Sequence, residues 1–117
     1  MTDSVFRPLE TSADWEDALD RSDDTAILVF KHSSSCSISG SANEEMKTLA
    51  AEEDVPVYRV VVQESRDVSD TIEDTLNVRH ETPQAILVQD GRAVFDTSHL
   101  NVTADTLRTE WHRAPAA

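Results

Sequence analysis

Cys36 is the only cysteine of the 117-residue chain, and it lies where a polar loop gives way to a segment with helical spacing. The first turn of a helix has unpaired backbone N–H groups and a partial positive charge, and both stabilise a thiolate. Because the thiolate is the nucleophilic form of cysteine, we interpret Cys36 as a reactive thiol rather than an inert core residue. Lys31 and His32 precede it in the same loop, and they would add positive potential if their side chains point toward the sulfur.

Ser39 follows Cys36 at the spacing C-x-x-S, where a dithiol oxidoreductase has a second cysteine. The Ser39 hydroxyl can donate a hydrogen bond to the sulfur or cap the helix, but it cannot form a disulfide. A mixed disulfide on Cys36 therefore needs a second, external thiol to release it. A small-molecule thiol is the natural candidate for that step.

Apolar segments on both sides of Cys36 predict an α/β fold that places the thiol directly after a buried strand. Strands are expected over residues 25–30, 57–62, 85–88 and 92–97, with a further strand near residues 6–9. Helices are expected to begin at Thr11 or Ser12, at Cys36, at Ser69 or Asp70, and after Thr103. Asp14 would complete a capping box with Thr11. The apolar stripe of the second helix is expected to consist of Ile38, Ala42, Met46, Leu49 and Ala50.

The order of these elements is typical of a thioredoxin-like fold, in which helices flank a mixed central sheet. A strand–helix–strand unit requires a right-handed crossover and a parallel pair of strands. The Asp90-Gly91 dipeptide then predicts a hairpin that adds an antiparallel strand. We expect one thioredoxin-like domain over residues 1–113 and a C-terminal tail over residues 114–117.

The dipeptide Thr82-Pro83 directly precedes the third main strand. In thioredoxin-like domains a cis-proline at this position lies against the reactive cysteine. We therefore predict a cis Thr82-Pro83 bond beside Cys36, since an X-Pro bond adopts the cis form at a small energetic cost. Thr82 would then offer its backbone to an extended substrate. His80 could help to shape this groove or protonate a leaving thiol.

The composition excludes several classes of partner. A formal net charge of −13 leaves no basic patch for nucleic acid or for an anionic membrane surface. No apolar run reaches the roughly 20 residues of a membrane span. The first residues lack the parts of a signal peptide, and one cysteine fits a reducing compartment, so we expect a cytoplasmic protein. The four histidines and two glycines form no metal-ligand spacing and no phosphate loop, so neither a metal site nor a cofactor is expected.

The sequence resembles the YtxJ family of monothiol bacilliredoxins. FKHS at residues 30–33 with CSIS at residues 36–39 is close to the pattern FKHS-x-x-CPIS, and HETPQ at residues 80–84 is close to HESPQ. Later DG and SH positions also match, and the similarity runs from about residue 26 to residue 107. The resemblance implies a thioredoxin fold, with Cys36 as the nucleophile and Pro83 as the cis-proline. It also implies two kinds of partner, bacillithiol and the client proteins that carry it as a mixed disulfide.

Two departures from the family pattern bear on the thiol. Ser37 replaces the proline of CPIS, and Gly40 follows the motif within the predicted helix. Both loosen the start of the helix, and either could alter the reactivity of the sulfur.

Three other functions stay open at this stage. Ser33-x-x-Cys36 is similar to the T-x-x-C of peroxiredoxins, which suggests a single-cysteine thiol peroxidase, although the upstream proline is missing. A monothiol glutaredoxin-like iron–sulfur carrier would have C-G-F-S, whereas this chain has Ser37 and Ile38 between Cys36 and Ser39. A redox-inert stress or interaction protein that keeps the fold is the third. The absorbance spectrum separates a cluster carrier from the others.

Overall fold

The computed structural model describes residues 5–53 and 55–113, and its five strands form one sheet in the order β1-β3-β2-β4-β5. The strands are β1 (Arg7–Pro8), β2 (Ile27–His32), β3 (Val57–Val61), β4 (Gln84–Gln89) and β5 (Arg92–Ser98). The sheet is mixed, as predicted, because β3 runs parallel to β1 and β2 whereas β4 runs antiparallel to β2 and β5. The tail expected over residues 114–117 lies outside the described residues.

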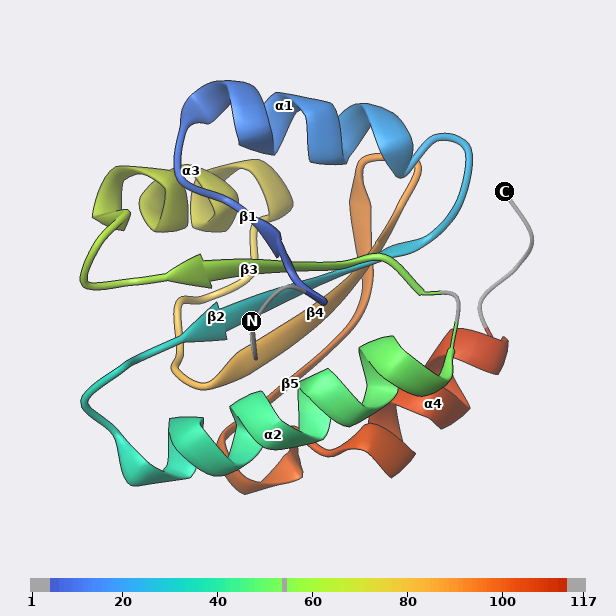
Figure 1. Cartoon of the computed structure of the whole chain (residues 1–117). Helices are drawn as coiled ribbons and strands as arrows, with labels where there is room; N and C mark the ends of the chain where they lie inside the picture. Colours follow the sequence, from blue (N-terminus) through green and yellow to red (C-terminus); the bar gives the residue numbers. More distant parts are fainter. Residues whose placement is uncertain (1–4, 54, 114–117) are drawn as a thin grey trace.

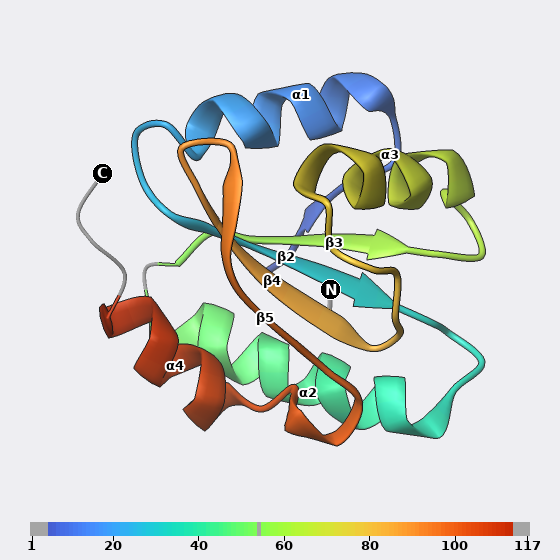
Figure 2. The same cartoon turned by 180° about the vertical axis from the view of Figure 1, so that it is seen from behind.

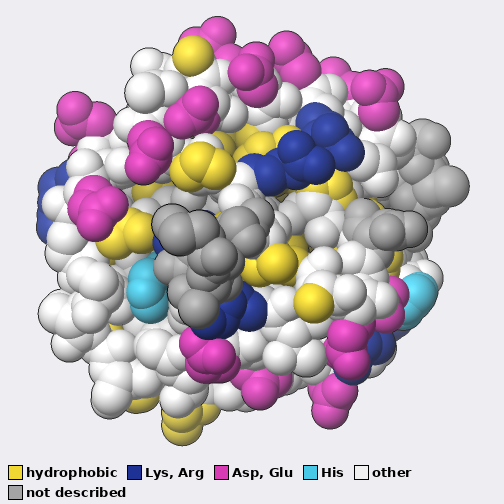
Figure 3. Space-filling view, viewed as in Figure 1, with side chains coloured by type: hydrophobic (Ala, Val, Ile, Leu, Met, Phe, Trp, Pro, Cys, Tyr) yellow, Lys and Arg dark blue, Asp and Glu magenta, His cyan; other side chains and the backbone are white. Residues whose placement is uncertain are grey.

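Two layers of helices enclose this sheet, with α1 and α3 on one face and α2 and α4 on the other (Figures 1 and 2). The helices are α1 (Ser12–Arg21), α2 (Ser37–Glu52), α3 (Arg66–Leu76), α4 (Ala104–Arg113) and the short 3₁₀ helix η1 (His99–Asn101). This arrangement of layers is the one that the sequence predicts. On the face drawn in Figure 3, acidic side chains are more widespread than basic ones and gather along its upper and lower margins.

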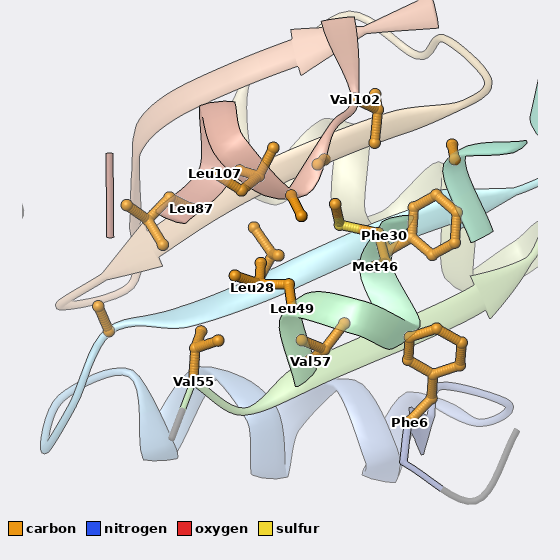
Figure 4. Close-up of a cluster of buried hydrophobic side chains, with 14 residues drawn as sticks. Phe6, Leu28, Phe30, Met46, Leu49, Val55, Val57, Leu87, Val102 and Leu107 are labelled. Carbon is orange, nitrogen blue, oxygen red and sulfur yellow. The ribbon is translucent and has the colours of Figure 1, made fainter. Parts of the chain in front are cut away.

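The central strand β2 is buried on both faces, as its continuous apolar run predicts. Leu28 and Phe30 face α2 and join the cluster that also contains Met46 (Figure 4). Ile27 and Val29 belong to the second cluster, beneath α1 and α3. Because side chains of a strand alternate between faces, this strand anchors both layers and fixes where its carboxyl end, and hence Cys36, must lie.

Local signals account for several of the boundaries. Thr11 caps α1, and the capping box with Asp14 is confirmed: Thr11 Oγ1 accepts from the Asp14 N–H at 3.1 Å and the Asp14 carboxylate accepts from the Thr11 N–H at 3.2 Å. Asp90 and Gly91 both have positive φ, 54° and 73°, as the predicted hairpin requires. Thr103 accepts a hydrogen bond from the Thr106 N–H at 3.2 Å, which confirms its expected place before α4.

Two expectations about helices were wrong. The third helix begins at Arg66 and not at Ser69 or Asp70, because Val68 is already part of the buried stripe that Ile72 continues four residues later. Ile38 does not belong to the buried stripe of α2, since its side chain is 39% exposed. The stripe instead begins at Ser39, one position further along the helix, which turns Ile38 outward.

Candidate active site at the carboxyl end of β2

Cys36 occupies the N-cap position of α2, four residues beyond the end of β2, and its side chain is half-buried. Its carbonyl oxygen accepts the first helical hydrogen bond, from the Gly40 N–H at 3.0 Å. In the described part of the chain the sulfur makes no capping hydrogen bond. The first turn of α2 reads SISG and carries no acidic side chain that would offset the positive end of the helix. The thiol therefore lies where the sequence places it.

Ser39 has a different role from either of the two expected for it. Its hydroxyl accepts a hydrogen bond from the Ser33 N–H at 2.9 Å and lies 2.9 Å from His32 Nδ1. The side chain is fully buried. The hydroxyl thus fastens the end of β2 and the start of the loop to the first turn of α2. Among the described residues the hydroxyl bonds Ser33 and His32, rather than the sulfur or the backbone of the helix start that the sequence offered as its partners.

Gln63 holds the same loop from the other side, and the sequence analysis missed it. Its amide nitrogen donates to Ser33 Oγ at 2.7 Å and to Ser35 Oγ at 3.0 Å, and its amide oxygen accepts from the Ser34 N–H at 3.2 Å. The position of Gln63 in the chain could have indicated this role. Gln63 follows the strand that runs parallel to β2, and the ends of parallel neighbours meet at one edge of the sheet.

Lys31 bonds to α3 and to the segment before β4. Its side chain is fully buried on the α3 face of the sheet, where Nζ donates to the Ser69 carbonyl oxygen at 3.2 Å and lies 3.1 Å from His80 Nδ1. Burial lowers the pKa of the Lys31 ammonium, and the negative charges of Glu73 and Asp70 partly oppose that shift. The sequence analysis placed Lys31 in the loop before Cys36, whereas the residue belongs to strand β2 and its ammonium bonds on the α3 face.

His80 is tied to α3 as well as to Lys31. Its backbone N–H donates to the Glu73 carboxylate at 2.8 Å, and Ser69 Oγ lies 3.3 Å from its Nδ1. Burial lowers the pKa of His80, and the charge of Lys31 lowers it further, against the opposing effect of Glu73. A ring with a lowered pKa is neutral at neutral pH, so it is poorly suited to protonate a leaving thiol.

The Thr82-Pro83 bond is cis, which confirms the predicted isomer, while its place beside Cys36 stays a prediction. Pro83 is buried and lies one residue before Gln84, which pairs with Lys31 across β2 and β4. Its carbonyl oxygen accepts from the His99 N–H at 2.8 Å, and His99 Nε2 lies 3.2 Å from a Glu81 carboxylate oxygen. The loops before α2, α3 and β4 thus gather at one end of the sheet, which Figures 1 and 2 show from opposite sides.

The described residues offer neither a metal cluster nor a membrane span. Over residues 5–53 and 55–113, no three His, Cys, Asp or Glu side chains gather closely enough to hold a metal ion. None of the helices in these ranges is long and apolar enough to cross a membrane.

Known structures share this fold. A structure described as a candidate oxidoreductase with a thioredoxin fold is 30% identical, with a TM-score of 0.84, over 92% of this chain and 95% of that chain. Thioredoxin from Fasciola hepatica is 22% identical, with a TM-score of 0.76, over 94% of this chain and 100% of its own. A point mutant of thioredoxin from Halobacterium salinarum is 18% identical, with a TM-score of 0.75, over 92% of this chain and 88% of its own.

The fold and the single thiol at a helix start define a thiol–disulfide oxidoreductase of the thioredoxin-fold class. The sequence identifies the family within this class more narrowly than the fold does. Residues 7–107 match the family model of the monothiol bacilliredoxin BrxC, and the chain belongs to that family.

Proposed function

We propose that the protein removes bacillithiol, a low-molecular-weight thiol, from mixed disulfides on client proteins, with Cys36 as the nucleophile. The observation that carries this proposal is the place of the only cysteine. Cys36 is half-buried at the N-cap of α2, and its sulfur makes no capping bond inside the described part of the chain, so the thiol is available for exchange. Membership of the monothiol bacilliredoxin family supports bacillithiol as the cap.

The first step is a disulfide exchange that balances without an added oxidant. The Cys36 thiolate attacks the bacillithiol sulfur of the mixed disulfide, and a new disulfide forms between Cys36 and bacillithiol. The bond between bacillithiol and the client breaks, and the client sulfur leaves as a thiolate that takes a proton from water. The partial positive charge at the start of α2 favours the attacking thiolate.

The second step needs another thiol, because the chain holds no second cysteine. A free small thiol attacks the bacillithiol sulfur on Cys36, so the Cys36 thiolate is regenerated and a small-molecule disulfide is released. Ser39 occupies the position of a resolving cysteine, but its hydroxyl is committed to Ser33 and His32. Turnover therefore depends on the concentration of small thiol, which fits the reducing cytoplasm that we propose as its location.

The remaining candidate residues support this reaction by shaping the site. We propose that Thr82 and cis-Pro83 form the groove in which the capped client lies. His32 and Ser39 hold the loop that carries Cys36, through their contact at 2.9 Å. Lys31 and His80 contact each other on the α3 face of the sheet and support the segment that leads into the groove.

Intact-protein mass spectrometry tests the proposal directly. The reduced protein is mixed with a client that carries one bacillithiol on its only cysteine. The expected product has the mass of one added bacillithiol, located on Cys36, together with an uncapped client. The Cys36→Ser variant is the matched control and should remain unmodified. If the client stays capped while simple disulfides also fail to react with Cys36, the proposal is wrong and a redox-inert interaction protein takes its place.

A further inference from the structure

Lys31 is a buried ammonium that takes no part in the bond-making and bond-breaking steps of the exchange reaction. Its side chain is fully buried, and its nitrogen meets the Ser69 carbonyl oxygen and His80 Nδ1, two uncharged acceptors. Burying an ammonium group is unfavourable unless its surroundings compensate for the lost hydration. Such a residue needs a structural or functional reason.

The contacts of Lys31 belong to a wider set that grips residues 79 and 80. Lys31 Nζ reaches His80 Nδ1 from β2, and the Glu73 carboxylate accepts from the His80 N–H from α3. Gln84, which is 1% exposed and pairs with Lys31 in the sheet, donates from Nε2 to the Arg79 carbonyl oxygen at 2.8 Å. Three elements therefore fix the segment that leads into Thr82 and cis-Pro83.

The contact with Lys31 also fixes the proton on the His80 ring. An ammonium has donors only, so Nδ1 must accept and the ring proton lies on Nε2. A second proton on Nδ1 would face the ammonium and break the hydrogen bond. The charged groups around the ring are Lys31 and Arg66, which oppose that second proton, and Asp70 and Glu73, which favour it.

We propose that Lys31 and His80 are positioning residues for the segment that enters cis-Pro83, and that their hydrogen bond sets the affinity for the capped client rather than the reactivity of Cys36. This inference rests on the proposed function. Its basis is the set of contacts that Lys31 makes, which join it to Ser69 and His80 and, among the described residues, not to Cys36. Lys31 projects to the α3 face, whereas α2, whose N-cap is Cys36, packs on the opposite face.

Two rates separate affinity from reactivity. The rate of Cys36 alkylation by iodoacetamide depends on the reactivity of the thiolate and not on binding in the groove. The rate of exchange with the bacillithiol-capped client depends on both the thiolate and the groove. We expect Lys31→Met to lower the client exchange rate constant about tenfold, the effect of losing one hydrogen bond to a charged group, and to change alkylation less than about twofold. The loss should appear as a higher KM at similar kcat. Lys47→Met is the matched control, because Lys47 is the other lysine and lies in a surface ion pair with Glu44.

His80→Asn gives the second, independent readout. The amide oxygen of the introduced asparagine can accept from Lys31 where Nδ1 did, but it does not titrate. We therefore expect this variant to restore most of the exchange that His80→Leu loses. Because burial and Lys31 lower the pKa of His80, the ratio of exchange to alkylation should fall in the wild type as the pH drops below about 6.5, and it should stay level in His80→Asn.

Folding and the proposed function are each controlled. Methionine replaces the buried lysine with an apolar chain of similar length, a change that proteins often tolerate. Hydrogen–deuterium exchange over residues 79–83 needs no substrate, and Lys31→Met should raise it while Lys47→Met should not. If wild-type protein fails to exchange with the client but this pattern is seen, only the proposed function is wrong. Unchanged hydrogen exchange, or alkylation that falls as much as client exchange, would overturn the positioning role.

Discussion

Replacing Ser39 by alanine removes a hydroxyl that fastens the Cys36 loop from beneath. The hydroxyl is fully buried, and it accepts from the Ser33 N–H at 2.9 Å. Ser33 is itself 8% exposed, so its N–H would lose its acceptor where water has little access. Leaving a buried donor unpaired costs about 1–3 kcal/mol. The higher helix propensity of alanine offsets about 0.5 kcal/mol of this cost, so the free energy of unfolding is expected to fall by about 1–2 kcal/mol.

Urea unfolding followed by tryptophan fluorescence measures this loss. The midpoint should fall while the denaturant slope m stays constant, and Tm should drop by roughly 4–8 °C. Ser37→Ala is the matched control, because Ser37 is an exposed serine in the same turn and should change stability by less than about 0.5 kcal/mol. Mixed-disulfide formation at Cys36 should continue in both variants. A Ser39→Ala protein as stable as the wild type would show that the hydrogen bond to Ser33 contributes nothing, and the reasoning would fail.

Three further outcomes follow from single residues. Folding lowers the pKa of His80, so the unfolded chain binds the proton more readily than the folded protein does. The free energy of unfolding should therefore fall as the pH drops below about 6.5, and it should fall by less in His80→Asn. Equal pH profiles of the two proteins in urea titrations would contradict this. Gly40→Ala should raise stability by about 0.5–1 kcal/mol in thermal unfolding, because a Cβ at this helical position meets no atom within 4 Å among the described residues. Gln63→Leu should lower the free energy of unfolding by about 1–2 kcal/mol and change the rate of Cys36 alkylation severalfold, because three hydrogen bonds to the loop are lost. An alkylation rate equal to that of the wild type would argue against a role for Gln63 at the thiol.

The parts of the fold that local chemistry determines could be predicted from sequence. The Thr11 capping box, the positive φ of Asp90 and Gly91, and the cis bond before Pro83 each depend on residues close together in the chain. The place of Cys36 at a helix start followed from the apolar run before it.

The contacts made by side chains at the site could not be predicted in the same way. Which face Lys31 points to depends on where α3 packs, and this is a property of the whole sheet. Gln63 lies 27 positions after Cys36 and carries no motif, so only the parallel pairing of β2 and β3 brings it to the loop. Ser39 was recognised as the partner of a C-x-x-S pattern, but the pattern says nothing of which atoms the hydroxyl meets.

The two outer strands of the sheet also influence how copies of the protein meet at high concentration. β1 pairs over two residues only, and one of them is Pro8, which has no N–H to offer to a further strand. On the other edge, exposed Arg92 and Asp96 flank Val94, and the register shifts between Leu87 and Val88 in the pairing with β4. Charged side chains and an irregular ladder both discourage edge-to-edge pairing. Strand-mediated aggregation is therefore disfavoured at both edges. The remaining way for two copies to join is a disulfide between their Cys36 sulfurs, formed under oxidative stress. A small thiol would reduce that disulfide by the same exchange reaction that releases bacillithiol from Cys36.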